Sequence, residues 1–139
     1  MNKVHFMSKN QEWGTPQKLF DELDKHYHFT LDPCATAENA KCKKYFTKEQ
    51  DGLLQVWGGC EVVFCNPPYG RGIEKWVKKC FDHWKNGGTA VMLIPARTDT
   101  RWFHDYIYNR ATVYFLKGRI IFEGAVHNAP FPSMIVVFG

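Results

Sequence analysis

Two short, almost wholly apolar segments separated by one amphipathic segment constrain this 139-residue chain more than any other feature. Residues 61–65 (EVVFC) and 89–94 (TAVMLI) have the length and composition of strands that are buried on both faces of a parallel sheet. Between them, apolar residues recur from Ile73 to Trp84 at the spacing of a helix that buries one face. Because a strand, a helix and a second strand in this order form a crossover unit, we expect an α/β sheet.

Weaker patterns before this unit extend the sheet on one side. A helix is expected from Thr15-Pro16 to about Tyr27, because threonine is a good N-cap and proline fits the first helical position. Short strands are expected at 29–32 and 45–47, and one or two helical turns between 35 and 44.

The patterns after this unit extend the sheet on its other side. A helix is expected around residues 102–107 and a strand at 112–116. The turn pair at 117–118 predicts a hairpin to a further strand at 119–122, and a last apolar strand is expected at 134–138. We therefore expect a mostly parallel sheet with an antiparallel C-terminal strand and helices on both faces.

Length and composition favour a single domain over residues 1–139 that folds around one core, because 45% of the residues are hydrophobic and 23% are charged. No apolar run is long enough to cross a membrane, and the start Met1–Phe6 lacks the apolar core of an export signal, so a cytoplasmic location is expected. The odd number of cysteines, five, favours free thiols over a disulfide framework. Their spacing contains no Cys-x-x-Cys pair, so no metal site is expected.

Positive charge is concentrated in the second half of the chain. Residues 1–69 hold 8 Lys and 9 acidic residues, whereas residues 70–139 hold 10 basic and 5 acidic residues. All five arginines lie in the second half, and arginine suits contacts with phosphates and base edges. The pattern indicates an anionic partner, and solvated surface charge remains an equal alternative at this stage.

The tetrapeptide Asn66-Pro67-Pro68-Tyr69 follows the apolar strand expected at 61–65 and carries the most chemical information. Ligands of open α/β sheets bind outside the carboxyl ends of the strands, where this tetrapeptide is expected to lie. Its two prolines fix the backbone and remove two N–H donors. The Asn66 side-chain oxygen and the Pro67 carbonyl are suited to accept hydrogen bonds from an –NH2 group, and the Tyr69 ring to stack on a planar heterocycle. A double-proline turn of purely structural role is the alternative.

This tetrapeptide resembles the catalytic motif of S-adenosylmethionine-dependent amino-methyltransferases, in particular the short phage-type DNA N6-adenine methyltransferases. Further segments are similar to that family in the same order and cover nearly the whole chain. They are Trp13-Gly14-Thr15-Pro16, Leu31-Asp32-Pro33-Cys34-Ala35, Asp51-Gly52-Leu53, residues 93–100 with Trp102-Phe103, Gly118-Arg119-Ile120 and Ala129-Pro130-Phe131-Pro132-Ser133. The resemblance implies a Rossmann-like methyltransferase sheet that forms one catalytic domain without a separate target-recognition domain.

The resemblance also implies a role for each matching residue. Catalytic residues would be Asn66, Pro67, Pro68 and Tyr69, with the target base flipped out of the duplex onto Tyr69. Asp32 would pair with the α-ammonium of S-adenosylmethionine. The implied cofactor-binding residues are Trp13, Thr15, Pro16, Asp32, Pro33, Cys34, Asp51, Leu53 and Asn66, with no metal.

Two parts of the family pattern are weaker in this chain. The glycine-rich turn of methyltransferases at large is absent after the first strand, where Asp32-Pro33-Cys34-Ala35 stands instead. An acidic residue for the cofactor's ribose is represented only by Glu49, which is better explained as a solvated charge.

Contacts with DNA are expected from the second half of the chain. The candidates are Arg71, Arg97, Arg101, Arg119 and Phe131. His127 and Asn128 lie in the same loop as Phe131 and are candidates to cover a flipped base, and a proline-rich surface loop of no such role is the alternative.

The function implied by the resemblance is methyl transfer from S-adenosylmethionine to the N6 amine of adenine in DNA, in a bacterial or phage-infected cell. Alternatives with the same fold and cofactor are cytosine N4, an RNA base or a protein glutamine as acceptor, and a non-catalytic DNA-binding relative is a further one. The positive second half favours nucleic acid over glutamine. The recognition sequence stays open, as does the choice between a monomer and a homodimer.

Overall fold

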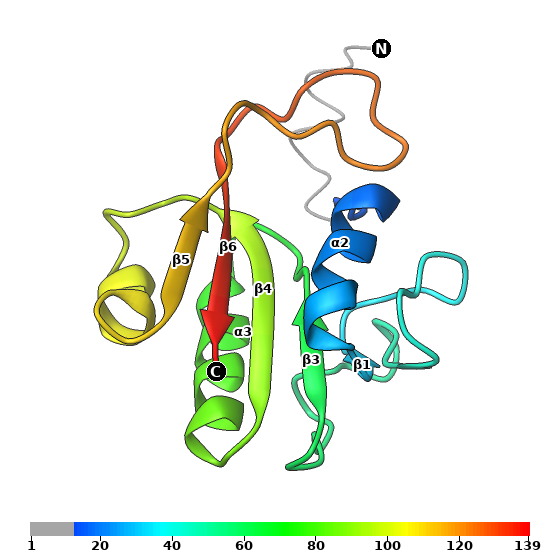
Figure 1. Ribbon diagram of the computed structural model, residues 1–139, viewed down its shortest axis with the longest axis vertical. Helices are drawn as coiled ribbons and strands as arrows, with labels where there is room; N and C mark the ends of the chain where they lie inside the picture. Colours follow the sequence, from blue (N-terminus) through cyan, green and yellow to red (C-terminus); the bar gives the residue numbers. More distant parts are fainter. Residues whose placement is uncertain (1–12) are drawn as a thin grey trace.

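The computed structural model describes residues 13–139, so the expectation based on Met1–Phe6 concerns residues outside it (Figure 1). Its helices and strands follow the order expected of an alternating α/β chain. In chain order they are α2 (Gln17–Tyr27), β1 (Leu31–Asp32), β2 (Lys44–Tyr45), β3 (Val62–Cys65), α3 (Ile73–Lys85), β4 (Thr89–Pro95), the π-helical turn η1 (Phe103–Ile107), β5 (Thr112–Phe115) and β6 (Ser133–Phe138).

The strands form one six-stranded sheet with the order β2-β1-β3-β4-β6-β5. The pairs β1–β2, β1–β3 and β3–β4 are parallel, and β6 runs antiparallel to both of its neighbours, β4 and β5. The expected mostly parallel sheet with an antiparallel C-terminal strand is therefore confirmed.

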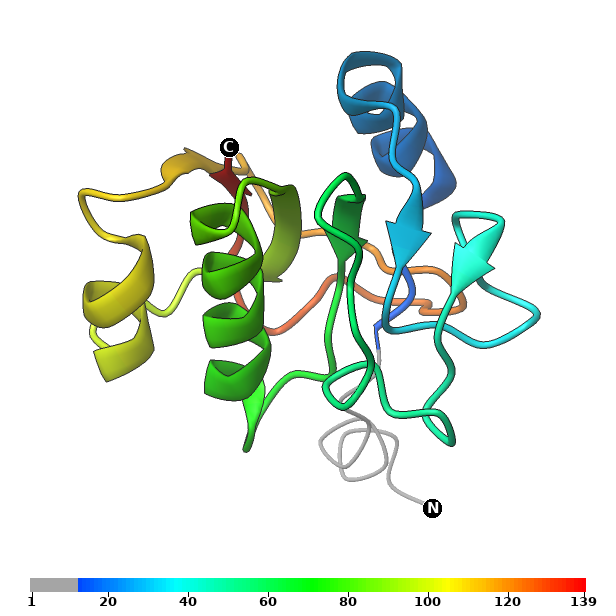
Figure 2. The same cartoon turned by 90° about the horizontal axis from the view of Figure 1, so that it is seen from below.

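Helices cover both faces of this sheet, as expected (Figure 2). On one face, Phe20 of α2 packs edge-on against Phe64 of β3, with ring centroids 5.2 Å apart. On the other face, Phe81 and Trp84 of α3 pack against Phe138 of β6. Successive side chains of a strand point to opposite faces, so this alternation builds one core on each side of the sheet.

Helix α3 begins at Ile73, where the apolar spacing predicts it. The buried residues of α3 include Trp76, Val77 and Cys80, which form the predicted apolar stripe. The helix ends at Lys85, shortly before Gly87, whose φ of 101° places it in the left-handed region that terminates helices.

One expectation for the N-terminal half is wrong in detail, and another is confirmed only in part. Helix α2 begins at Gln17 with Pro16 at the N-cap position, because the Thr15 hydroxyl accepts a hydrogen bond from Asn66 rather than capping the helix. The segment 35–44 forms a single helix-type turn, in which the Ala40 N–H group donates to the Thr36 carbonyl at 3.0 Å, and no helix. There the Thr36 and Asn39 side chains bond each other's backbone N–H groups, an alternative to helical hydrogen bonding that short polar side chains offer.

The expected hairpin from 117–118 into a strand at 119–122 is also wrong. Strand β5 pairs with β6 instead, with Thr112 opposite Val137, and residues 116–132 form a long loop between the two strands. Phe122 is buried against Trp13, with ring centroids 5.4 Å apart, whereas Ile121 is exposed, so Phe122 serves packing rather than sheet formation. We call residues 116–132 the β5–β6 loop.

The strand order reverses around β1, because the chain places β2 on one side of it and β3 on the other. Parallel strands bring their carboxyl ends to the same edge of the sheet, so the end of β1 at Asp32 lies beside the end of β3, which Asn66 follows. Such a reversal is where ligands bind in open α/β sheets. Among residues 13–139, no helix is long and apolar enough to cross a membrane.

Candidate active site

A pocket of about 630 Å³ opens at this reversal. It brings together every implied cofactor-binding residue except Pro16, and of the implied catalytic residues it includes Asn66 and Pro68. Pro67 and Tyr69 are buried and do not line it. The lining residues are Trp13, Gly14, Thr15, Asp32, Pro33, Cys34, Asn39, Thr47, Lys48, Asp51, Gly52, Leu53, Phe64, Asn66, Pro68 and Trp76.

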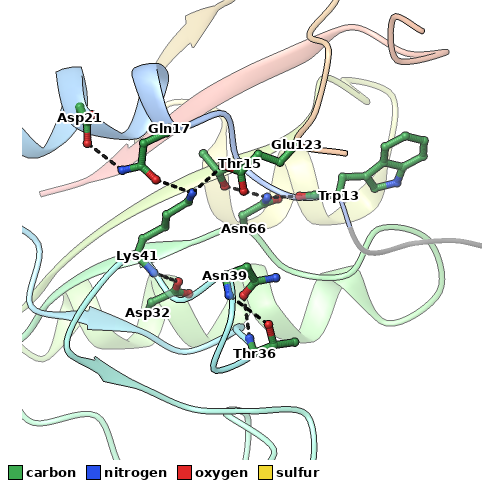
Figure 3. Close-up of polar contacts among 10 residues, drawn as sticks. All are labelled: Trp13, Thr15, Gln17, Asp21, Asp32, Thr36, Asn39, Lys41, Asn66 and Glu123. Atoms are coloured by element: carbon green, nitrogen blue, oxygen red, sulfur yellow. Dashed lines mark hydrogen bonds and ion pairs between the residues drawn. The ribbon is translucent and has the colours of Figure 1, made fainter. Parts of the chain in front are cut away.

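The Asn66 side chain is held by hydrogen bonds on both of its polar atoms, of which Figure 3 shows those of the nitrogen to Trp13 and Thr15. Its Nδ2 donates to the Trp13 carbonyl and, at 2.9 Å, to the Thr15 hydroxyl, while its Oδ1 accepts from the Tyr69 hydroxyl at 2.6 Å. Because a backbone carbonyl only accepts, the atom that faces Trp13 must be the nitrogen, which fixes the amide orientation. Oδ1 then keeps one lone pair for a further donor.

Tyr69 lies behind Asn66 and is only 2% exposed. Its hydroxyl also lies 3.0 Å from the Leu93 carbonyl, and burial raises the pKa of this phenol well above its usual value, so the group stays a proton donor. Its ring meets the edge of the Phe131 ring at 5.5 Å and of the Phe122 ring at 6.1 Å. Stacking of a base on Tyr69 therefore requires that the β5–β6 loop, which carries both phenylalanines, moves.

Asp32 also lines the pocket and is 5% exposed. Its two carboxyl oxygens accept from the backbone N–H groups of Cys34 (3.3 Å) and Lys41 (3.0 Å). Burial raises the pKa of Asp32 to about 6, although both hydrogen bonds oppose the rise. A buried carboxylate that two amides do not fully compensate favours a cationic ligand.

The loop that carries Asp51 and Leu53 is pressed against the Asp32 loop through Gly52. A Cβ atom at position 52 would lie 2.2 Å from the Pro33 carbonyl oxygen, so only glycine permits this contact. The loop is anchored from the other side by Lys79, whose Nζ donates to the carbonyl of Leu53 at 3.0 Å. The close contact with Pro33 thus explains why glycine stands at the centre of Asp51-Gly52-Leu53.

The candidate DNA-contacting residues are not among those that line the pocket. All four predicted arginines are exposed, and one of them, Arg119, donates to the Ala129 carbonyl within the β5–β6 loop at 3.4 Å. Phe131 packs edge-on against Trp13 at 5.5 Å as well as against Tyr69, so it joins the loop to the tetrapeptide. His127 and Asn128 are exposed in the same loop.

Several pocket residues escape the sequence analysis. Glu49, the candidate for the cofactor's ribose, is exposed and does not line the pocket. Its neighbours Thr47 and Lys48 do line it. Trp76 has the apolar helical spacing of a core residue, and it is buried and lines the pocket as well. Asn39 and Lys48 carry no pattern that marks them, because their place depends on how distant segments meet.

The cysteines are free thiols, and one of them, Cys34, lines the pocket while half-buried. Cys65 and Cys80 are buried, and Cys60 is exposed. In the part of the chain that the structure describes, no cluster of three or more His, Cys, Asp or Glu side chains is arranged to hold a metal ion.

Comparison with known proteins extends the resemblance noted from the motifs. A DNA N-6-adenine-methyltransferase of Escherichia phage T1 is 32% identical over 106 residues, which cover 76% of this chain and 44% of the phage protein. The Escherichia coli K12 protein YfdM is 34% identical over 64 residues, which cover 42% of this chain and 70% of that protein. The family model for DNA N-6-adenine-methyltransferase (Dam) matches residues 4–138, and the chain therefore belongs to the Dam family.

Proposed function

We propose that this chain transfers a methyl group from S-adenosylmethionine to the N6 amine of adenine in DNA, using a Rossmann-like methyltransferase sheet as a single catalytic domain. One observation carries the proposal: a single pocket joins a buried carboxylate, Asp32, to an amide, Asn66, whose oxygen keeps one lone pair for a further donor. Family membership and the phage T1 relative support adenine as the target.

The residues present fit the proposed cofactor. Asp32 is suited to the α-ammonium group because a cation offsets the cost of its burial. Asp51 and Leu53 lie in the same pocket and are suited to a ring amine and to a ring face. When bound, S-adenosylmethionine supplies a methyl group on a positively charged sulfur, which is already strongly electrophilic.

The chain's own task is to hold the accepting amine in line with that methyl group. The Asn66 oxygen accepts a hydrogen bond from the amine, which favours a more tetrahedral nitrogen with an exposed lone pair. The contacts of Asn66 with Trp13, Thr15 and Tyr69 keep its amide in one orientation before substrate arrives. Preorganisation of this kind accounts for large rate effects without a strong base.

The target base must leave the duplex to reach the pocket, because its N6 amine is paired inside the helix. We infer that the β5–β6 loop moves so that Phe131 exposes the Tyr69 ring, on which the base stacks. The exposed Arg71, Arg97, Arg101 and Arg119 then contact the DNA backbone.

The direct test is incubation of the purified chain with unmethylated duplex DNA and methyl-labelled S-adenosylmethionine, followed by mass spectrometry of the nucleosides. We expect label in N6-methyladenine. The variant Asn66→Ala should abolish transfer and leave cofactor affinity within a few fold, because the oxygen it removes accepts from the substrate.

The other outcomes separate the alternatives. Label in N4-methylcytosine would move the proposal to another base, and transfer to RNA or protein alone would remove DNA as the substrate. Verified cofactor binding without any transfer, or no cofactor binding at all, would contradict the proposed activity.

A further inference from the structure

The side chain of Lys41 lies where three segments meet, although no motif contains it (Figure 3). Its ammonium nitrogen lies 2.8 Å from Oε1 of Gln17 at the start of α2 and 3.2 Å from Oε2 of Glu123 in the β5–β6 loop. The Lys41 side chain is only 7% exposed, whereas that of Glu123 is 42% exposed. A lysine is thus buried at the junction of segments that lie far apart in sequence.

The backbone of the same residue reaches the cofactor side of the pocket. The Lys41 N–H group donates to Oδ2 of Asp32 at 3.0 Å and is one of the two amides that hold this carboxylate. The backbone at Lys41 therefore helps to place the Asp32 carboxylate. One residue consequently contacts the proposed ammonium-binding carboxylate and the β5–β6 loop at once.

Glu123 connects this junction to the target side of the pocket. Its N–H group donates to the Gly14 carbonyl at 2.8 Å in an antiparallel bridge. Gly14 stands between Trp13 and Thr15, the two residues that accept from Asn66. The approach is close, because a Cβ atom at position 14 would lie 2.9 Å from the Cβ atom of Glu123.

We propose that Lys41 is a positioning residue, which through Glu123 fixes the spacing between Asp32 and Asn66 across the pocket. This inference rests on the proposed function. A half-exposed carboxylate partner contributes little to overall stability, yet a buried lysine is costly without a partner. Such a pair is better explained by the geometry it imposes than by the stability it adds.

The pair should act on the chemical step, because methyl transfer depends on the alignment of the two groups that Asp32 and Asn66 hold. Lys41→Met keeps the apolar stem and removes the charge, and Glu123→Gln keeps the shape of a half-exposed side chain and removes its charge. For each we expect kcat to fall by roughly 10- to 100-fold, as for small misplacements of reacting groups, with the Kd of S-adenosylmethionine and the KM for DNA nearly unchanged.

The conservative variant Lys41→Arg should restore most of kcat, because it keeps a cation at this place. Lys78→Met is the matched control, since Lys78 forms an exposed ion pair with Asp82 within α3 and should leave kcat unchanged. Amide hydrogen exchange gives a readout that does not depend on activity. The backbone of residues 120–125 should exchange faster in Lys41→Met and Glu123→Gln than in the wild type, and not in the control.

The outcomes test the proposed function and the role of Lys41 separately. An inactive wild type contradicts the proposed function, and hydrogen exchange then decides on Lys41 alone. An active wild type whose kcat and exchange are unchanged in Glu123→Gln overturns the positioning role even where Lys41→Met fails to fold. The role is equally overturned where kcat and cofactor affinity fall by the same factor.

Discussion

The stability of the cofactor-free chain should decrease as pH rises through about 6, because Asp32 is buried as a carboxylate that its two amide partners do not fully compensate. Its pKa rises from an ordinary value of 3.8 in the unfolded chain to about 6 in the folded one. A folded-state pKa above the unfolded one means that the folded protein binds the proton more tightly. The contribution to stability is therefore complete below the unfolded pKa and is lost as pH rises through the folded one.

The size of the effect follows from the two pKa values. Each unit of difference corresponds to about 1.4 kcal/mol, so the full change approaches about 3 kcal/mol. Roughly 2 kcal/mol of it falls between pH 4 and pH 7, because the two titrations overlap there. Asp32 is almost wholly buried, so solvent screening does little to reduce this figure.

The assay is urea unfolding of the wild type and of Asp32→Asn, monitored by tryptophan fluorescence at several pH values between 4 and 7. The amide of the variant accepts only one of the bonds from Cys34 and Lys41, a cost that does not change with pH and cancels in the difference curve. The stability of the variant relative to the wild type should increase by about 2 kcal/mol from pH 4 to pH 7. A difference that stays constant with pH would refute the reasoning about Asp32.

The same group should make cofactor affinity depend on pH. If the carboxylate is the form that binds S-adenosylmethionine, the Kd should rise about tenfold for each pH unit below 6 and level off above it. Titration calorimetry at several pH values measures this dependence. An affinity that does not change between pH 5 and pH 8 would separate Asp32 from cofactor binding.

Three further predictions concern single residues. Tyr69→Phe removes the hydroxyl that hydrogen-bonds the Asn66 amide and should lower kcat about tenfold with little change in DNA affinity, whereas unchanged kcat would assign Tyr69 to packing alone. Gly52→Ala places a Cβ atom 2.2 Å from the Pro33 carbonyl oxygen, so the Kd of S-adenosylmethionine should rise at least tenfold in calorimetry, and an unchanged Kd would contradict the close contact. S-adenosylhomocysteine should protect Cys34 from thiol alkylation and leave Cys60 reactive, as mass spectrometry can show, while equal labelling would place the ligand elsewhere.

The parts of the fold predicted correctly depend on patterns that lie within one segment. The apolar spacing of α3 and the continuous apolar strands β3 and β4 determine their own burial, so these elements appear where they are expected. The expectation of a hairpin after β5 is wrong for the opposite reason. A local turn signal at 117–118 competes with the pairing of β5 and β6, which the sequence around the turn does not reveal.

The same distinction applies to the site. Asp32 and Asn66 follow strands, so their arrival at one edge of the sheet can be predicted from strand order alone. The contact of Lys41 with Glu123 joins residues 82 positions apart and depends on the course of two irregular segments. The loop conformation that buries Tyr69 beneath Phe131 is equally beyond a reading of local patterns.

The two ends of the β5–β6 loop meet at the sheet, where the Leu116 N–H group donates to the Ser133 carbonyl at 3.0 Å. A loop closed at its base can gain residues at small cost, about 0.6 kcal/mol for each doubling of its length. Insertions there would leave the register of β5 and β6 unchanged, because strand pairing fixes that register independently. Evolution, or a library of grafted segments, can therefore vary the surface beside the candidate active site while the pairing of the sheet stays unchanged.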